Sequence, residues 1–174
     1  MKNPLISIGL PTYNGSLRIK PAIESVLNQE YTHWELIISD NASEDDTQII
    51  CEQFRRQDQR IKYYRQTINL GAVANFQAVL HKANGAYFMW LGDDDALSCN
   101  YIKECAEFLM AHQDYVLVGG KAEYYLHDNT FLYQGAIIDL EQELATDRVL
   151  SYYSQVSDNG IFYGLIRPQE LKKI

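Results

Sequence analysis

The sequence predicts an α/β fold: a mainly parallel β-sheet flanked by helices, with a small antiparallel hairpin after an acidic motif. In the first half of the chain, short apolar segments alternate with segments of helical periodicity, as in βαβ units with right-handed crossovers. After Gly120 this alternation stops, and residues 123–126 and 130–133 have the pattern of a hairpin.

The first strand and helix have clear signals. Residues 5–10 form an apolar strand that is expected to stop at Pro11, because proline has no amide donor for a sheet. Ile19, Ile23 and Val26 follow at helical spacing, in a helix that is expected to run to about residue 29.

The second strand, residues 34–39, ends at Asp40, and a helix follows it. Ser43 and Asp46 have the spacing of a capping box, which predicts that Ser43 opens this helix. The side chains expected to point inward from it are Ile49, Ile50 and Phe54.

The remaining elements extend the same pattern. Residues 86–91 are almost wholly apolar, which favours a central strand. The other expected elements are strands at 61–65, 115–118 and 161–166 and helices at 72–82, 100–111 and 140–153.

Length and composition limit the class of protein. The chain has 174 residues and a mass of 20.1 kDa, the size of one domain, and its 47% hydrophobic residues exclude a disordered chain. The net charge of -8 argues against a nucleic-acid partner, because that binding requires basic residues to neutralise phosphates.

Cysteine usage and hydropathy indicate the compartment. The three cysteines, Cys51, Cys99 and Cys105, have no paired or metal-binding spacing, so reduced thiols and a cytoplasmic setting are expected. No apolar run approaches the roughly 18 residues of a membrane span, so no transmembrane segment is expected.

Polar residues follow each of the first four strands. Because the carboxyl ends of parallel strands share one edge of the sheet, where ligands bind, these residues are expected to converge. They are residues 11–15, 40–43, 69–71 and 92–95.

The acidic triplet Asp93, Asp94 and Asp95 requires compensation, because adjacent carboxylates raise one another's proton affinity. A divalent cation would supply it, and oxygen ligands favour Mg²⁺ or Mn²⁺. The alternative is a solvated acidic turn.

The other rim residues have weaker signals. Asp40 and Asn41 could accept from a ribose hydroxyl or a base N–H, or could only form an Asx turn. Asn69 and Gly71 could be only a turn, and Asn75 only a polar surface residue.

Together these residues resemble the family 2 glycosyltransferases, whose nucleotide-sugar-binding domain has the Rossmann-like GT-A fold. The resemblance covers about residues 5–109, with the motifs in the order and spacing of the family. The matching motifs are Pro-Thr-Tyr-Asn at 11–14, residues 22–29, 35–45, Asn-Leu-Gly at 69–71 with Asn75, and Gly85 before residues 87–95.

The resemblance implies site residues. Thr12 and Asp40 would contact the nucleoside, with Asp40 reading the base. The acidic triplet would be the DXD element, with Asp94 as the direct metal ligand and Asp93 or Asp95 in support. The implied nucleotide-binding residues are Pro11, Thr12, Tyr13, Asn14, Asp40, Asn41, Asn69, Gly71, Asn75 and Asp93.

The resemblance also implies the reaction. A nucleotide-diphosphate sugar, with UDP as the expected nucleotide, would bind with Mn²⁺ or Mg²⁺ and transfer its sugar with inversion to a glycan or lipid-linked acceptor. This reaction belongs to polysaccharide biosynthesis, in the cytoplasm or at the inner face of the membrane. Asp158 is the candidate catalytic base, although a turn residue beside Asn159 and Gly160 is an equal alternative.

Residues 1–174 are expected to form a single GT-A domain that ends before the acceptor region is complete. The alternative function is a catalytically incomplete nucleotide-sugar-binding module. A phospho-acceptor signalling domain would leave the Pro-Thr-Tyr-Asn motif unexplained. The oligomeric state is open, with the Tyr-rich residues 124–163 as a candidate interface.

Overall fold

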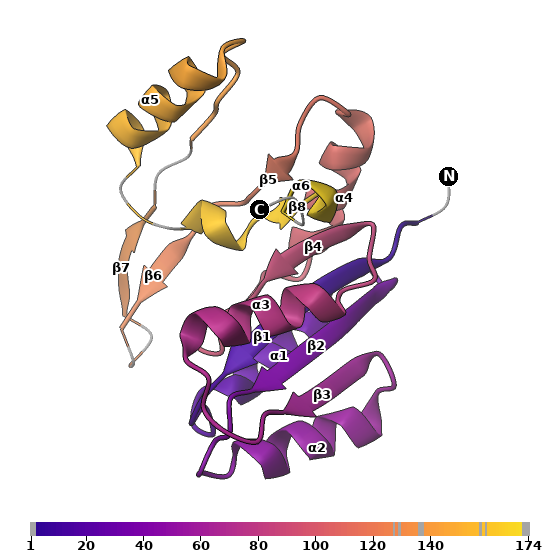
Figure 1. Cartoon of the computed structure of the whole chain (residues 1–174). Helices are drawn as coiled ribbons and strands as arrows, with labels where there is room; N and C mark the ends of the chain where they lie inside the picture. The colour runs from indigo at the N-terminus through magenta and orange to yellow at the C-terminus, as the bar shows by residue number, and fades with distance from the viewer. Residues whose placement is uncertain are drawn as a thin grey trace. The chain divides into compact units, whose positions relative to one another are not determined.

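A computed structural model describes residues 3–126, 128, 130–135, 138–156, 158 and 160–171 (Figure 1). These residues divide into two parts: one contains the chain up to residue 118 and again from 165, and the other contains residues 119–164.

The first part is built on a six-stranded sheet in the order β3-β2-β1-β4-β8-β5. Strands β1 to β4 are parallel to one another, and β8 is antiparallel to both of its neighbours. The strands are β1 (Ile6–Thr12), β2 (Trp34–Asp40), β3 (Ile61–Arg65), β4 (Tyr87–Trp90), β5 (Leu117–Val118) and β8 (Leu165–Ile166). The mainly parallel sheet is therefore confirmed, with β4 inside it as expected.

Helices cover both faces of this sheet. They are α1 (Ile19–Leu27), α2 (Thr47–Gln57), α3 (Ala72–Lys82), α4 (Tyr101–Ala111) and α6 (Pro168–Leu171). The larger core cluster joins the sheet to α1, α2 and α4, and it includes Ile8, Ile23 and Ile102. On the other face Val79 of α3 packs with Ile37 and Phe88, and Figure 1 shows α3 crossing β1 and β2.

Strand β1 continues two residues beyond its expected end. It pairs with β2 from Ile6 to Thr12, so Pro11 lies inside it, opposite Ser39. The pairing with β4 has ended by then, because its last partners are Gly9 and Trp90. Proline is tolerated where one side of a strand has no ladder to complete, and this brings Thr12 to the edge of the sheet.

Helix α2 begins later than the capping-box spacing predicts. Its N-cap is Asp46, with no side-chain capping bond, while the Ser43 hydroxyl accepts from the Asn14 amide. The helical phase differs accordingly: Cys51 is fully buried, Ile50 and Phe54 pack against the core, and Ile49 is exposed. The prediction of an inward Ile49 was therefore wrong.

The second part holds a hairpin and one longer helix. Strands β6 (Glu123–Tyr125) and β7 (Phe131–Gln134) are antiparallel, which confirms the expected hairpin, although His127 and Asn129 of its turn lie outside the described residues. The helix α5 (Ala145–Gln155) begins later than predicted. Residues 160–163 form the short 3₁₀ helix η1 (Gly160–Tyr163), so the late strand contracts to β8.

Candidate functional site

The carboxyl ends of β1 and β2 lie side by side. Thr12, the last residue of β1, pairs with Asp40, the last residue of β2, and Asp40 pairs in turn with Arg65 of β3. The chain after β4 reaches the same edge, because the Leu91 amide donates to the Gly9 carbonyl at 2.9 Å. The topology thus gathers the predicted polar segments at one edge of the sheet.

Thr12 connects β1 directly to the acidic turn. Its hydroxyl donates to Asp93 Oδ2 at 2.6 Å. Arg18 Nη2 lies 3.3 Å from the same carboxylate oxygen. Asp93 is therefore held by one neutral and one charged donor, and both donors come from the segment that ends and follows β1.

Asp40 is at the predicted place but is enclosed. Its side chain is 0% exposed: Oδ1 accepts from the Ser43 amide at 2.8 Å, and Oδ2 accepts from the Tyr63 hydroxyl at 2.6 Å. Arg65 Nε adds a cation 3.5 Å from Oδ2. Both oxygens of the Asp40 carboxylate, which was expected to read a base, are thus in contact with its local turn and with β3.

Tyr63 is a partner that the sequence reading missed. Burial, and the hydrogen bond and negative charge of Asp40, raise the pKa of Tyr63 far above its usual value. The phenol therefore stays protonated and donates to Asp40. No sequence signal indicated this contact, since Tyr63 reads only as one aromatic residue of a strand.

Asn41 organises the loop after β3. Its Nδ2 donates to Asn69 Oδ1 at 2.8 Å, and its Oδ1 accepts from the Leu70 amide at 2.9 Å. Gly71 has a φ of 84°, which glycine adopts without steric cost, and its amide also donates to Asn69 Oδ1. The structure thus brings these three predicted residues together.

Asn75 fastens α3 to the same edge. Its Nδ2 donates to the Ser39 carbonyl at 2.9 Å and to the Thr12 carbonyl at 3.2 Å, so the side chain bridges the ends of β2 and β1. It is buried, contrary to the surface alternative. Its Oδ1 is a buried acceptor with no partner among the described residues.

The loop after β1 is locked to the loop after β2. Asn14 has a φ of 50°; its amide donates to Ser43 Oγ, and its Oδ1 accepts from the Glu44 amide. Tyr13 is 42% exposed at this edge, whereas Pro11 is buried within β1. Of the two, only Tyr13 therefore presents a side chain to solvent.

Asp94 and Asp95 turn toward the same space. A Cβ atom built on Gly92 would lie 2.5 Å from Asp95 Oδ2 and 3.0 Å from Asp94 Oδ1, so both carboxylates fold over this glycine. Desolvation and the negative charges of Asp94 and Asp93 raise the pKa of Asp95. Negative charge is therefore in excess at this turn.

The chemistry of these donors fits a cation that arrives with its own oxygen ligands. Within the described residues, no three His, Cys, Asp or Glu side chains form a ready-made metal group. Mg²⁺ and similar ions, however, are usually bound through one or two carboxylates, with substrate phosphates and water completing the shell. Asp94 and Asp95 match that donor set.

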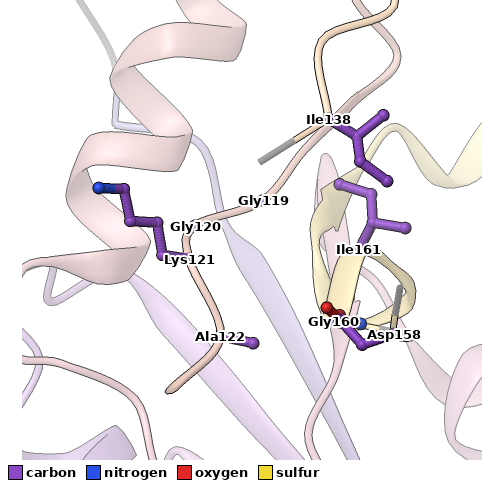
Figure 2. Close-up of a pocket in the computed structure, with 8 residues that line it drawn as sticks. All are labelled: Gly119, Gly120, Lys121, Ala122, Ile138, Asp158, Gly160 and Ile161. Atoms are coloured by element: carbon purple, nitrogen blue, oxygen red, sulfur yellow. Dashed lines mark hydrogen bonds between the residues drawn. The ribbon is translucent and has the colours of Figure 1, made fainter. Parts of the chain in front are cut away.

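Asp158 lies in the second part of the chain and lines a cavity of about 270 Å³. Its Oδ1 accepts from the Gly160 amide at 2.7 Å, the contact expected of a turn residue. Figure 2 shows Asp158, Ile138 and Ile161 around this space, while the Lys121 side chain points away from them. The cavity is lined by Gly119, Gly120, Lys121, Ala122, Ile138, Asp158, Gly160 and Ile161.

Comparison with known proteins gives the family. Residues 7–165 match the sequence model of Glycosyl transferase family 2. The chain is 34% identical over 103 residues to the UDP-Glc:alpha-D-GlcNAc-diphosphoundecaprenol beta-1,3-glucosyltransferase WfgD of Escherichia coli, a match that covers 59% of this chain and 40% of that protein. Other curated relatives are matched over 42%, 57% and 31% of their length, so the chain spans about a third to just over half of such proteins.

Solved structures share the fold. Staphylococcus aureus TarS 1-349 in complex with UDP-GlcNAc has a TM-score of 0.71 at 20% identity, over 97% of this chain and 46% of that one. The mannosyltransferase PcManGT from Pyrobaculum calidifontis, in complex with GDP-Man and Mn2+, has a TM-score of 0.70 at 14% identity, over 99% of this chain and 47% of that one.

The similarity at this level of identity shows the GT-A fold of these transferases, as predicted. Among the described residues, no helix is both long and apolar enough to cross a bilayer. The family match covers most of the chain and includes every strand of the site edge. The chain therefore belongs to glycosyl transferase family 2.

Proposed function

We propose that this chain binds a nucleotide-diphosphate sugar with Mn²⁺ or Mg²⁺ and transfers the sugar, with inversion, to a glycan or lipid-linked acceptor. The observation that carries the proposal is the hydrogen bond from Thr12 to Asp93, because it joins the Pro-Thr-Tyr-Asn segment to the acidic turn at one edge of the sheet. The relatives lend support: one is named for UDP-Glc and a diphosphoundecaprenol acceptor, and fold neighbours hold UDP-GlcNAc or GDP-Man.

The nucleoside would bind over the loops that end β1, β2 and β3. Tyr13 offers an exposed ring on which a base can stack, and the unpartnered Asn75 Oδ1 offers an acceptor. Asp40 would act through the loop that it holds, with its carboxylate fixing Ser43 and Tyr63 in place. The other proposed nucleotide contacts are Pro11, Thr12, Asn14, Asn41, Asn69, Gly71 and Asp93.

Asp94 and Asp95 would hold the divalent cation. When bound, such an ion supplies Lewis-acid stabilisation of the charge on the departing diphosphate, worth several kcal/mol. Asp93, one of the proposed nucleotide contacts, would also keep the turn in place through its bond to Thr12.

On the acceptor side, Asp158 would act as the base. The acceptor oxygen forms a bond to the anomeric carbon, the bond from that carbon to the diphosphate breaks with its electron pair leaving on the diphosphate, and the acceptor proton moves to Asp158. General-base assistance of this kind contributes about 10²–10⁴ in rate. The cavity beside Asp158 combines the apolar side chains of Ile138 and Ile161 with the Asp158 carboxylate, a mixture suited to a hydroxylated ring.

A thermal-shift panel tests the donor site. UDP and GDP are added with and without Mn²⁺ to the wild-type chain, to Asp94→Ala, and to Asp114→Ala, which removes the same charge from an exposed loop. At a hundredfold excess over Kd a ligand adds about 2.7 kcal/mol to the free energy of unfolding. We expect Mn²⁺-dependent stabilisation by a nucleotide in the wild type and in Asp114→Ala, and its loss in Asp94→Ala.

Absence of any nucleotide response in the wild type would refute the donor site. A sugar-transfer assay with Asp158→Asn tests the base, since retained transfer would remove Asp158 from that role. Nucleotide binding without transfer by the wild type would favour the alternative function, a catalytically incomplete binding module.

A further inference from the structure

Arg18 faces the acidic turn from the loop between β1 and α1. Its Nη2 atom lies 3.3 Å from Asp93 Oδ2 and 3.4 Å from Oδ1. The Arg18 side chain is 47% exposed, whereas that of Asp93 is only 13% exposed. The pair thus joins a solvent-facing cation to a largely buried anion.

The contact between Arg18 and Asp93 is loose. Charge-assisted hydrogen bonds between a guanidinium and a carboxylate are usually about 2.7–2.9 Å long. By comparison, the ion pair of Arg60 in this chain is short, with Nη2 2.6 Å from Asp58 Oδ2. Half-exposed ion pairs at longer distances contribute little free energy, so Arg18 can leave Asp93 at small cost.

The single positive charge of Arg18 does not neutralise the acidic turn. Three carboxylates lie in sequence, and within the described residues neither Asp94 nor Asp95 forms an ion pair. A divalent cation on Asp94 and Asp95 would cancel the remaining negative charge of the turn and weaken the attraction between Arg18 and Asp93. A diphosphate that arrives with the cation brings non-bridging oxygens, which a planar guanidinium binds through two N–H groups at once.

We infer that Arg18 is an exchangeable counter-ion: it holds Asp93 in the absence of donor and donates to the donor's diphosphate once a divalent cation occupies the turn. This inference rests on the proposed function. It makes Arg18 a donor-binding residue that leaves its structural partner, with the Thr12 hydroxyl still holding Asp93.

The test compares two substitutions that remove the same charge from the same stretch of chain. Arg18→Gln removes the proposed counter-ion. Lys20→Gln, two residues later, removes a cation that is 64% exposed and lies 3.8 Å from Glu24. Arg18→Lys keeps the charge but loses the planar fork, and it stands in if Arg18→Gln does not fold.

Two titrations are made on the full chain. Calorimetry measures UDP and GDP in saturating Mn²⁺, and electron paramagnetic resonance measures Mn²⁺ alone. We expect Arg18→Gln to weaken nucleotide binding about tenfold, the effect of one lost charged hydrogen bond, and Arg18→Lys to fall between. We expect Mn²⁺ alone to bind Arg18→Gln about threefold more tightly, because a competing cation is gone. Lys20→Gln should change each affinity less than about twofold.

The possible outcomes distinguish a failure of this inference from a failure of the proposed function. If the wild type binds UDP or GDP and Arg18→Gln binds it as Lys20→Gln does, the inference is wrong and the donor site stands. Tighter nucleotide binding by Arg18→Gln would also overturn it, since Arg18 would then only restrain Asp93. If the wild type binds neither nucleotide, the proposed function fails and the inference fails with it.

Discussion

The hydroxyl of Thr12 donates a 2.6 Å hydrogen bond to Asp93, 81 positions further along the chain. The bond ties the last residue of β1 to the turn after β4, two strands that pair only as far as Gly9 and Trp90. Beyond that point the strands separate, and this side-chain contact continues the connection. The geometry of the acidic turn therefore depends on the strand next to it.

Replacing Thr12 with valine tests this dependence. Thr12→Val keeps the shape of the side chain but leaves a largely buried Asp93 without its neutral donor, so we expect a loss of about 1–3 kcal/mol in the free energy of unfolding. Urea unfolding measures it. Thr67→Val, at an exposed threonine, is the matched control and should stay within about 0.5 kcal/mol. Equal effects of the two changes would contradict a special role for the Thr12 hydroxyl.

The parts that sequence predicts best are those that depend on periodicity. β3 and α3 have the predicted bounds, since the local residue pattern of each segment decides both. The meeting of Thr12 with Asp93 follows from a rule of topology, because parallel strands share one edge for their carboxyl ends.

The features that sequence did not predict are contacts between residues far apart in the chain, which no local pattern specifies. For Asp40, which was expected to contact the nucleoside, no local pattern predicted the hydrogen bond from Tyr63 of the neighbouring strand. Ser43 has the spacing of a cap, yet its hydroxyl meets Asn14 of another loop. A late strand was expected at residues 161–166, but β8 contains only two residues and pairs antiparallel with β4, a partner far away in the sequence that no local pattern specifies.

Ala42 has a left-handed backbone, which predicts a stabilising substitution. Its φ is 62°, a region that costs an L-residue roughly 1–2 kcal/mol and glycine almost nothing. Glycine also has more entropy to lose on folding, so we expect Ala42→Gly to gain about 0.5–1 kcal/mol. Ala78→Gly, in the interior of α3, should instead lose about 1 kcal/mol. Thermal melts measure both, and a loss at Ala42 would show that its conformation is not strained.

Glu35 predicts an acid-sensitive contribution to stability. Burial by itself would raise the pKa of Glu35, but hydrogen bonds from Lys62, Ser7 and the Asn84 amide outweigh it and lower that pKa below its ordinary 4.5. Since the folded pKa lies below the unfolded one, the stabilisation is complete above about pH 4.5 and is lost as the pH falls toward the folded pKa.

We therefore expect Glu35→Gln to be less stable than the wild type by about 1–3 kcal/mol at pH 7, with a smaller difference at pH 3. Urea unfolding at the two pH values measures this change. Glu24→Gln, at an exposed carboxylate 3.8 Å from Lys20, should show little difference at either pH. A difference for Glu35→Gln that does not shrink in acid would show that the carboxylate does not depend on these donors.

Gly92 and Gly85 form a matched pair in which the same added methyl group has different consequences. A Cβ atom on Gly85 would lie 2.6 Å from the Ser7 amide nitrogen and 2.6 Å from the Tyr87 carbonyl oxygen, both backbone atoms that cannot move aside. On Gly92 it would meet the ends of the Asp95 and Asp94 side chains, which can rotate away. Gly85→Ala should therefore destabilise the fold by about 1–3 kcal/mol, whereas Gly92→Ala should leave its stability within about 0.5 kcal/mol.

Gly92→Ala should instead lower the affinity for the divalent cation. If Asp94 and Asp95 hold the cation, displacing both carboxylates from above Gly92 should weaken Mn²⁺ binding about tenfold, the size of effect seen when the support of a ligand is disturbed. Mn²⁺ titration by electron paramagnetic resonance, with unfolding curves on the same samples, separates the two effects. An unchanged Mn²⁺ affinity in a folded Gly92→Ala protein would show that the cation does not depend on the carboxylates at this turn.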